Sequence, residues 1–386
     1  MSEVSVHDVE QLLARMVRIP SVNPRGEHAP GEGELGRFVG DWLAGAGLRV
    51  ETHEAFPGRS NIIARLPGVG PGPALLLNSH LDTVEIDGMT VEPFGADVVD
   101  GRLYGRGSCD AKGCLSAFML AVRAVAMSGT PPPRDVELVA SVDEEAGGGG
   151  ILRFMESVSA PRERYSAALI GEPTELRLVT ATKGGIRFTV RTLGRASHSS
   201  QPWEGDNAIY RMQDVLTFLR ETLEPELSAL SHPLVGTPTI VPTLISGGAG
   251  WNIVPPSCTV SIDRRLVPGE DPLDVFSGYQ ERFLALAPGH IEVEGPPQVI
   301  FAPETPPDAP IARALGSALS ARGLDATPLG VNYGTDGAKI APHGIPIVVF
   351  GPDSISRAHQ ADESVSLEQV ATAACVVIDV VRGFTG

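Results

Sequence analysis

The order of apolar and polar positions divides the chain into helical and extended segments. Residues 8–18 carry apolar side chains at helical spacing, and residues 111–128 form a second predicted helix, rich in Ala, Leu and Met. Short apolar runs of strand length occur at 60–68, 74–84, 136–145, 166–174 and 345–351. Apolar strands that alternate with helices predict an α/β sheet covered on both faces.

The pattern changes near residue 183. Residues 186–194 alternate as a half-exposed strand does. After them we expect a helix at 206–222, strands at 237–248 and 257–266, a helix at 272–287 and a strand at 290–295. This strand–helix–strand–strand–helix–strand order is that of a ferredoxin-like α+β domain. We therefore predict an α/β domain of residues 1–181 and 293–386, with a second domain of residues 182–292 inserted into it.

Composition narrows the functional classes. A chain of 386 residues is long enough for about two domains. Its net charge of −17 disfavours nucleic acid as a partner. The absence of a long apolar run predicts no membrane span, and the acidic N-terminal segment lacks a signal-peptide pattern, so we expect a cytoplasmic protein. The four cysteines form no C-x-x-C pair and are expected to be reduced, mostly buried thiols.

The first candidate site residues close the apolar run at 74–84. His80 and Asp82 are two positions apart, so in a strand they point to the same side. A neighbouring carboxylate can fix the tautomer of a histidine and leave its other nitrogen free for a metal or for proton transfer. Alone, such a pair is more often a surface turn than a site.

Further polar groups lie at apolar strand ends or in glycine-rich turns. Ligands bind at the strand ends of open α/β sheets, so we expect these groups to converge. Four carboxylates would then repel one another, and two divalent cations would neutralise them. Imidazoles with shared carboxylates suit zinc, and also cobalt or manganese, and one carboxylate can bridge two ions. The converging residues are His80, Asp82, Asp110, Glu144, Glu145, Glu172 and His359.

Each of these motifs also has a plain structural interpretation. Asp110 could be the N-cap of the helix that follows it, and Glu144 and Glu145 could lie in a solvated loop. Glu172 could be a turn residue, and His359 an exposed loop histidine. The joint order of the motifs is what favours a site.

That order resembles the M20 metallopeptidase family, which includes acetylornithine deacetylase, succinyl-diaminopimelate desuccinylase, aminoacylase and glutamate carboxypeptidase. The matching stretches span nearly the whole chain, and the last of them is most similar to acetylornithine deacetylase and its relatives. They are "SHLDTV", "GRGSCDAKG", "DEEAGG", "GEPT", "GRASHSSQPWEGDNAI", "NIVPPSCTVSIDRR" and "GTDGAKIAPHGIPIVVFGPDSISRAH".

The resemblance implies a role for each group in the predicted α/β domain. His80 and Glu172 would hold one metal, Glu145 and His359 the other, and Asp110 would bridge both, before a cis peptide bond to Ala111. Asp82 would orient His80. Glu144 would be the general base, taking a proton from the metal-activated water and passing it to the leaving amine.

The inserted domain is similar to the lid and dimerisation domain of these enzymes. The resemblance implies that His198 reaches the partner subunit's active site in a homodimer and stabilises the oxyanion. Arg265 would clamp a substrate carboxylate, while Arg264 would face the other way because it is adjacent in a strand. Asn252, Gly334 and Thr335 match substrate-contacting positions.

The implied activity is hydrolysis of the amide of an N-acyl amino acid by a two-metal enzyme. A dipeptidase or carboxypeptidase is the closest alternative, and a non-catalytic binding protein on the same fold is a remote one. A dinucleotide enzyme is disfavoured, because no G-x-G-x-x-G opens a helix after a strand. Asp336 stands where several close relatives carry Glu, which leaves the identity of the substrate open.

Overall fold

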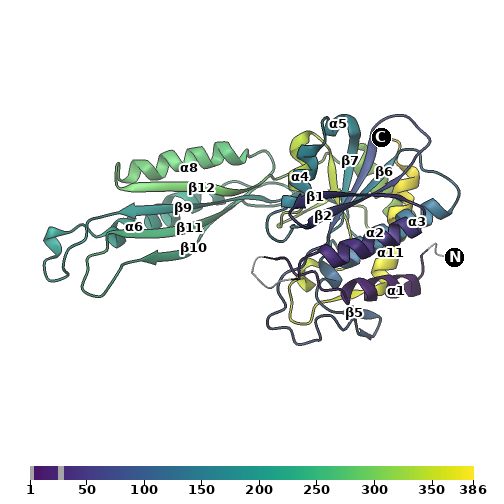
Figure 1. Ribbon diagram of the computed structural model, residues 1–386. Coiled ribbons are helices and arrows are strands. Elements are labelled where there is room, and N and C mark those ends of the chain that lie inside the picture. The colour runs from purple at the N-terminus through teal and green to yellow at the C-terminus, as the bar shows by residue number, and fades with distance from the viewer. Residues whose placement is uncertain (1–3, 25–29) are drawn as a thin grey trace. The chain divides into compact units, whose positions relative to one another are not determined.

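The computed structural model describes residues 4–24 and 30–386 and divides the chain into two compact units (Figure 1). The first unit holds residues up to Thr180 together with Glu304–Leu329 and Thr335–Gly386. The second holds Ala181–Pro303 and Gly330–Gly334. The predicted limit at residue 292 falls inside β12 (Ile291–Ile300), whose pairing with β9 (Gly184–Leu193) continues to Ile300. The second unit therefore extends further along the chain than the sequence pattern suggested.

The first unit is built around an eight-stranded mixed sheet of order β1-β2-β6-β3-β7-β14-β8-β13. The chain passes between the two units four times: within β8, after Pro303, within β13 and after Gly334. A small second sheet has the order β15-β5-β4. The strands are β1 (Arg49–Phe56), β2 (Arg59–Leu66), β3 (Ala74–His80), β4 (Val98–Val99), β5 (Arg102–Tyr104), β6 (Val136–Ser141), β7 (Tyr165–Ile170), β8 (Val179–Thr182), β13 (Leu329–Val331), β14 (Ile347–Val349) and β15 (Ser364–Ser366).

Helices cover both faces of this large sheet, as predicted. Alternate side chains of β3, β6 and β7, such as Leu77 and Leu138, share one core with α1, α2, α3, α9 and α11. The intervening side chains face the side of α4 and α10, and Asn61 of β2 donates to Gly150 O in α4. The helices are α1 (Val6–Val17), α2 (Gly33–Gly45), α3 (Cys114–Met127), α4 (Gly149–Ser157), α5 (Pro161–Arg164), α9 (Pro310–Ala321), α10 (Gly337–Ile340) and α11 (Leu367–Gly383).

The helix predicted at 111–128 begins later than expected. Residues Ser108–Gly113 form a wide π-type turn, η1, with non-helical backbone angles at Asp110 and Ala111, and regular α3 starts only at Cys114. The Asp110–Ala111 peptide bond is cis, as the resemblance implied. The turn places Asp110 at the N-terminal end of a buried helix.

The second unit has the predicted strand–helix–strand–strand–helix–strand order. Its antiparallel sheet has the order β10-β11-β9-β12, with β10 (Thr239–Gly247) at an edge and β11 (Ser257–Leu266) inside. Side chains of β9 and β11 alternate between a core shared with α6 (Ala208–Phe218) and α8 (Pro272–Leu286) and an open face. Beyond α6 the chain continues through η3 (Leu219–Leu223) and α7 (Glu224–Ser228). This is the ferredoxin-like arrangement that the polar pattern predicted.

Two observations concern the described part of the chain. No helix there is long and apolar enough to cross a membrane. The four cysteines are free and buried, as expected for reduced thiols in a chain of this size.

Candidate metal centre

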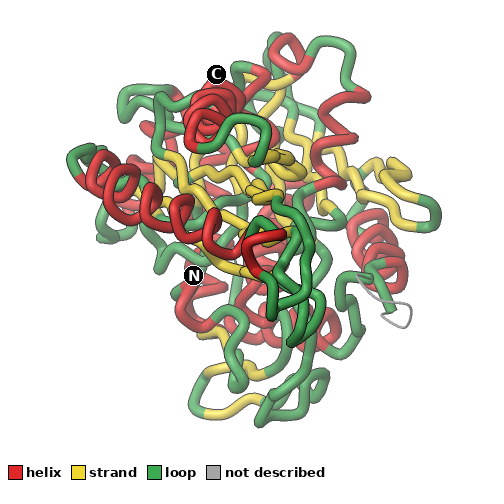
Figure 2. The backbone as a smooth tube through the Cα atoms, turned by 90° about the vertical axis from the view of Figure 1, so that its left-hand side faces the viewer, coloured by secondary structure: helices red, strands yellow, loops and turns green. Residues whose placement is uncertain are grey.

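Three neighbouring parallel strands bring the predicted site together. β3 pairs in parallel with β6 on one side and with β7 on the other, with His80 opposite Ser141. Glu144 and Glu145 follow β6, and Glu172 follows β7. The carboxyl ends of parallel strands meet at one edge of a sheet, so these side chains meet there with His80. Glu144, Glu145 and Glu172 lie in loops or turns beyond the strands. Figure 2 draws loops and turns of the chain in green.

Three atoms that could each donate an electron pair to a metal ion, here called donor atoms, surround the end of β3. His80 Nε2 lies 3.0 Å from Asp110 Oδ1 and 3.8 Å from Glu172 Oε1. All three residues are buried, and their donor atoms lie within 4.8 Å of one another. His80 Nδ1 lies 3.0 Å from the carbonyl oxygen of Asp82, to which it donates when Nε2 is the unprotonated nitrogen. That tautomer directs the Nε2 lone pair towards the two carboxylates.

A second set of donors uses the other oxygen of Asp110. His359 Nε2 lies 3.3 Å from Asp110 Oδ2 and 3.0 Å from Glu145 Oε1. These donor atoms also lie within 4.8 Å of one another. β14 runs parallel to β7 and leads into the loop that carries His359. Asp110 is therefore common to both sets, with one oxygen facing each histidine.

Asp82 contacts more than the histidine it was expected to orient. Its Oδ1 lies 3.6 Å from His80 Nδ1, further than its own carbonyl oxygen. The carboxylate accepts hydrogen bonds from the backbone amides of Glu144 and Glu145, both at 3.0 Å, and from Asn23 Nδ2 at 2.7 Å. Asp82 thus holds the loop that follows β6 as well as standing beside the imidazole.

Glu144 lies beside both donor sets without belonging to either. Among the described residues, no donor hydrogen-bonds to its carboxylate, although its backbone amide is held by Asp82. Burial, and the nearby charges of Glu172, Asp336 and Glu145, raise the pKa of Glu144 well above its usual value. A carboxyl group with a raised pKa and no fixed partner is suited to exchanging protons.

Two sequence comparisons show the family to which this chain belongs. Residues 76–383 match the family model described as peptidase family M20/M25/M40. Over 385 residues, covering 97% of each chain, the sequence is 31% identical to the acetylornithine deacetylase of Salmonella paratyphi B. The chain belongs to peptidase family M20/M25/M40. It is thus an enzyme of a family of metal-dependent hydrolases, as the resemblance implied.

Solved structures of M20 enzymes share the fold. The aminopeptidase PepT of Bacillus cereus superposes with a TM-score of 0.80 over the whole of both chains, at 19% identity. The M20 metallo-carboxypeptidase Sso-CP2 of Sulfolobus solfataricus gives 0.79 at 18% identity, covering 98% of this chain and 99% of its own. At such identities the likeness concerns the fold.

The M20 donor sets fit a pair of divalent ions. Two ligand atoms of a tetrahedral zinc lie about 3.3 Å apart, because each is about 2 Å from the metal. The four measured separations between an imidazole nitrogen and a carboxylate oxygen, 3.0 to 3.8 Å, bracket that value. Histidine with carboxylates is also a ligand set that zinc, cobalt and manganese accept.

The electrostatics of the site also favour the binding of cations. Burial beside other acids raises the pKa values of Glu145 and Glu172. Hydrogen bonds to Asp110 and Glu145 raise the pKa of His359 to about 10. Burial opposes ionisation of Asp110, but the hydrogen bonds from His359 and His80 outweigh it and hold the pKa of Asp110 well below its usual value. Without cations, protonated imidazoles supply the positive charge that these acids need.

Two of the predicted residues of the second unit, His198 and Asn252, lie on neighbouring segments. His198 is exposed and forms a bridge with Ile253, and the Ser199 amide donates to the carbonyl oxygen of Asn252. His198 Nδ1 accepts from the Ser200 amide at 3.2 Å and lies 2.7 Å from Ser200 Oγ. Because Nδ1 is an acceptor, the proton of the neutral ring is on Nε2.

Arg264 and Arg265 point to opposite faces of β11, as their adjacency predicted. Arg264 is buried against α8, where its Nε donates to Tyr279 Oη at 2.9 Å and its guanidinium pairs with Glu270. Arg265 is partly exposed on the open face and pairs with Asp263 at 2.7 Å. Of these two arginines, only Arg265 has its guanidinium near solvent.

Gly334 and Thr335 lie at the junction of the two units. Gly334 belongs to the second unit and Thr335 to the first. The buried Thr335 Oγ1 accepts from the Gly337 amide at 3.1 Å, so its hydroxyl binds the first amide of α10. Thr335 therefore has a local structural role whatever else it contacts.

The sequence did not reveal the buried residues that hydrogen-bond to the site residues and hold them in place. Glu363 binds the backbone around Asp110, and Asn23 binds Asp82. Asp336, noted only as a departure from relatives, is buried and accepts from Ser141 Oγ at 2.5 Å, and burial raises its pKa to about 6. Glu363 could have been suspected from "AHQADE", because it follows His359 by four residues; the position of Asn23 gave no signal.

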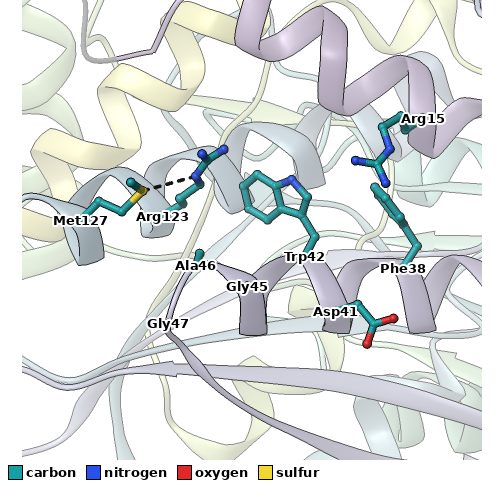
Figure 3. Close-up of a pocket in the computed structure, with 9 residues that line it drawn as sticks. All are labelled: Arg15, Phe38, Asp41, Trp42, Gly45, Ala46, Gly47, Arg123 and Met127. Atoms are coloured by element: carbon teal, nitrogen blue, oxygen red, sulfur yellow. Dashed lines mark hydrogen bonds between the residues drawn. The ribbon is translucent and has the colours of Figure 1, made fainter.

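A surface cavity of about 720 Å³ lies elsewhere on the first unit, between α1, α2 and α3 (Figure 3). The Arg15 guanidinium lies 4.6 Å from the ring centre of Phe38, and that of Arg123 lies 5.1 Å from Trp42. Within the described part of the chain, none of its lining residues is a predicted site residue. Both arginines are stacked on aromatic rings, and the described residues that line the cavity include none of the predicted metal ligands.

Metal binding should stabilise the protein by relieving the repulsion among these acids. Saturating zinc or cobalt, at about 100 times its Kd, should stabilise the first unit by about 2.7 kcal/mol. The melting temperature in the presence of the ion should therefore exceed that in chelator. The difference should shrink as the pH falls, because protons compete for the carboxylates and imidazoles.

Differential scanning fluorimetry measures this, with the double variant His80→Ala/His359→Ala as control. The control should melt at the same temperature with metal and with chelator. Equal melting temperatures for the unmutated chain in metal and in chelator would refute the metal assignment.

Proposed function

We propose that this M20 enzyme hydrolyses the amide bond of an N-acyl amino acid, as acetylornithine deacetylase does. The observation that carries the proposal is the pair of metal-ligand sets that share Asp110, with the Glu144 carboxylate, which accepts no hydrogen bond from the residues that the structure describes, beside them. The 31% identity to an acetylornithine deacetylase over 97% of both chains supports the acyl-amino-acid class of substrate.

His80, Asp110 and Glu172 would hold one divalent ion, and Asp110, Glu145 and His359 the other. Zinc is the first choice for this ligand set, and cobalt and manganese are the alternatives. Bound ions of this kind lower the pKa of water and polarise a carbonyl group. Asp82 would keep both ligand segments in place, since its carbonyl oxygen accepts from His80 and its carboxylate holds the Glu145 amide.

Glu144 would act as the general base. Its carboxylate would take the proton of the attacking water and then deliver it to the nitrogen of the leaving amino acid. The raised pKa of Glu144 supports the second transfer, since a carboxyl group that binds its proton more firmly remains protonated long enough to donate it. Asp82 fixes the backbone of Glu144, since its carboxylate accepts from the Glu144 amide at 3.0 Å.

His198 would stabilise the oxyanion of the tetrahedral intermediate in the partner subunit's site. Its Nδ1 is an acceptor from Ser200, so Nε2 carries the proton and can donate to an oxyanion. The role requires a homodimer formed through the second unit.

Exposed apolar side chains on that unit support such a homodimer. β10 is an edge strand with exposed Leu244 and Ile245, and Trp203, Tyr210 and Trp251 are also exposed. Edge strands and contiguous apolar surfaces commonly mark sites of association.

Arg265 would bind the carboxylate of the substrate, because it is the arginine of the pair whose guanidinium reaches the open face of the sheet. Asn252, Gly334 and Thr335 would contribute further substrate contacts. A cytoplasmic location stays a prediction from the sequence.

Dipeptide hydrolysis is the alternative within the same chemistry. The fold is shared with the aminopeptidase PepT and the metallo-carboxypeptidase Sso-CP2, and Asp336 departs from the deacetylase pattern. A hydrolysis screen followed by mass spectrometry distinguishes the two. N-acetyl, N-succinyl and N-formyl amino acids and a panel of dipeptides are offered to the zinc- or cobalt-loaded enzyme, with a chelator control. Chelator-sensitive release from dipeptides alone would overturn the deacylase proposal.

Glu144→Gln should lower kcat by roughly 10²–10⁴-fold, because general acid–base catalysis contributes that much. Binding of two metal ions should be unchanged, since Glu144 belongs to neither donor set. Elemental analysis and steady-state kinetics check both halves. A variant that keeps near-normal turnover would remove Glu144 from the role of base.

His198→Ala should lower kcat by roughly 10²–10³-fold, the usual effect of losing one oxyanion donor, and should leave the metals bound. If the residue acts in trans, mixing Glu144→Gln and His198→Ala chains should restore activity, because each mixed dimer contains one complete site. Ser199→Ala serves as the control, since its backbone amide rather than its side chain contacts Asn252. Failure of mixed dimers, detected as formed, to regain any activity would place His198 outside the partner's site.

Arg265→Ala should raise KM for carboxylate-bearing substrates at least tenfold and change kcat little, as expected when ground-state and transition-state binding are lost together. Arg187→Ala is the matched control, because Arg187 on β9 pairs with the same Asp263 at 2.9 Å. Each variant removes one of the two ion pairs of Asp263 and leaves the other, so only the loss of a substrate contact should separate them. Equal KM values for the two variants would assign the clamp to another residue.

A further inference from the structure

Glu363 is a carboxylate with no solvent exposure that accepts four hydrogen bonds from one short segment. Its Oε2 accepts from Arg106 Nη1 at 2.7 Å and from the Gly107 amide at 3.0 Å. Its Oε1 accepts from the amides of Cys109 and Asp110 at 2.9 and 3.1 Å. One side chain therefore satisfies a buried guanidinium and three backbone amides.

The pairing of two short strands brings Glu363 to this segment. β15 pairs with β5, with Ser364 opposite Tyr104, and the Gly105 amide donates to the carbonyl oxygen of Glu363 at 3.0 Å. The register places the side chain of Glu363 beside the turn that follows β5. Arg106 is held a second time through its Nε, which donates to the carbonyl oxygen of Glu85 at 3.0 Å.

The segment needs such an acceptor because it precedes a helix without being helical itself. Gly107 has a φ of 80°, and Asp110 has φ −119° and ψ 98°, so the amides of this turn lack a preceding helical turn to accept from them. A Cβ at residue 107 would lie 2.6 Å from Thr83 Cγ2, so the segment is also closely packed. Unbonded amides buried here would be unfavourable, and the carboxylate of Glu363 removes that penalty.

We infer that Glu363 is a positioning residue that aims Asp110 between the two metal positions. It holds the Asp110 amide on one side, while Asp110 Oδ1 and Oδ2 face His80 and His359 on the other. Glu363 also follows His359 by four residues, so it joins the loop of the shared ligand to the loop of a ligand specific to one ion. The inference rests on the metal centre of the proposed function.

A purely structural role would also explain a buried carboxylate, and Glu137 provides the comparison. Glu137 is a buried residue near the start of β6, at the end of the strand away from the metal centre. It accepts from Arg164 Nη2 and from Tyr165 Oη, both at 2.9 Å. Glu363 and Glu137 are thus both buried acids paired with an arginine, but only Glu363 contacts the backbone of a donor residue.

The experiment is a cobalt titration of the full chain carrying Glu363→Gln or Glu137→Gln. Glutamine keeps the shape of the side chain. It replaces one accepting oxygen with an NH₂ group, which cannot accept from the N–H groups that face Glu363. Glu363→Gln should weaken binding of cobalt roughly 10–100-fold, the usual effect of losing a partner that orients a metal ligand. The visible spectrum of the dicobalt form and the magnetic coupling of its two ions should change, because both depend on the bridging carboxylate. Glu137→Gln should lower the melting temperature while leaving affinity and spectrum unchanged.

The outcomes of the titration test the inference and the metal centre separately. Weaker and spectrally altered cobalt binding in Glu363→Gln alone supports the inference. Unchanged affinity and spectrum in Glu363→Gln, or equal weakening in Glu137→Gln, overturns it. If Glu363→Gln does not fold, Glu363→Asp keeps the charge but shortens the reach, and the same weakening is expected. An unmutated chain that binds no cobalt would refute the metal centre itself, whatever the variants do.

Discussion

The concentration of acidic groups at one edge of the sheet is the constraint on which the rest of the structure depends. Asp110, Glu144, Glu145 and Glu172 lie together beside two histidines where β6, β3 and β7 end. Like charges in a buried place oppose folding unless positive charge compensates them. Imidazoles facing both oxygens of Asp110 meet this need without cations, and divalent ions meet it when bound.

Two further carboxylates hold the loops that carry these acids. Asp82 accepts from the amides of Glu144 and Glu145, and Glu363 accepts from the amides of Gly107, Cys109 and Asp110. Both use an anionic side chain to fix backbone that no helix or strand satisfies. The predicted metal ligands are thus backed by two acids that contact the main chain.

In the second unit, the alternation of side chains along β11 separates a buried residue from an exposed one. Arg264 is buried against Tyr279, whereas its neighbour Arg265 pairs with Asp263 on the open face. Because successive side chains of a strand point to opposite faces, a core contact and a surface cation can occupy adjacent positions. The helices α6 and α8 cover only one face, and the other keeps its charged side chains near solvent.

The sequence by itself determined which segments are helices and strands and which residue types make up the predicted metal-ligand sets. Long apolar strands such as β3 and β6 carry a strong pattern because they are buried on both faces, and their polar ends reveal His80 and Glu144. The half-exposed edge strand β1 lacks such a run and was not predicted. Only the tertiary structure decided that Asp110 faces both histidines, that Asp82 holds the loop after β6, and that Glu363 supports Asp110. These contacts join residues up to 253 positions apart, and local periodicity contains no information about such pairings.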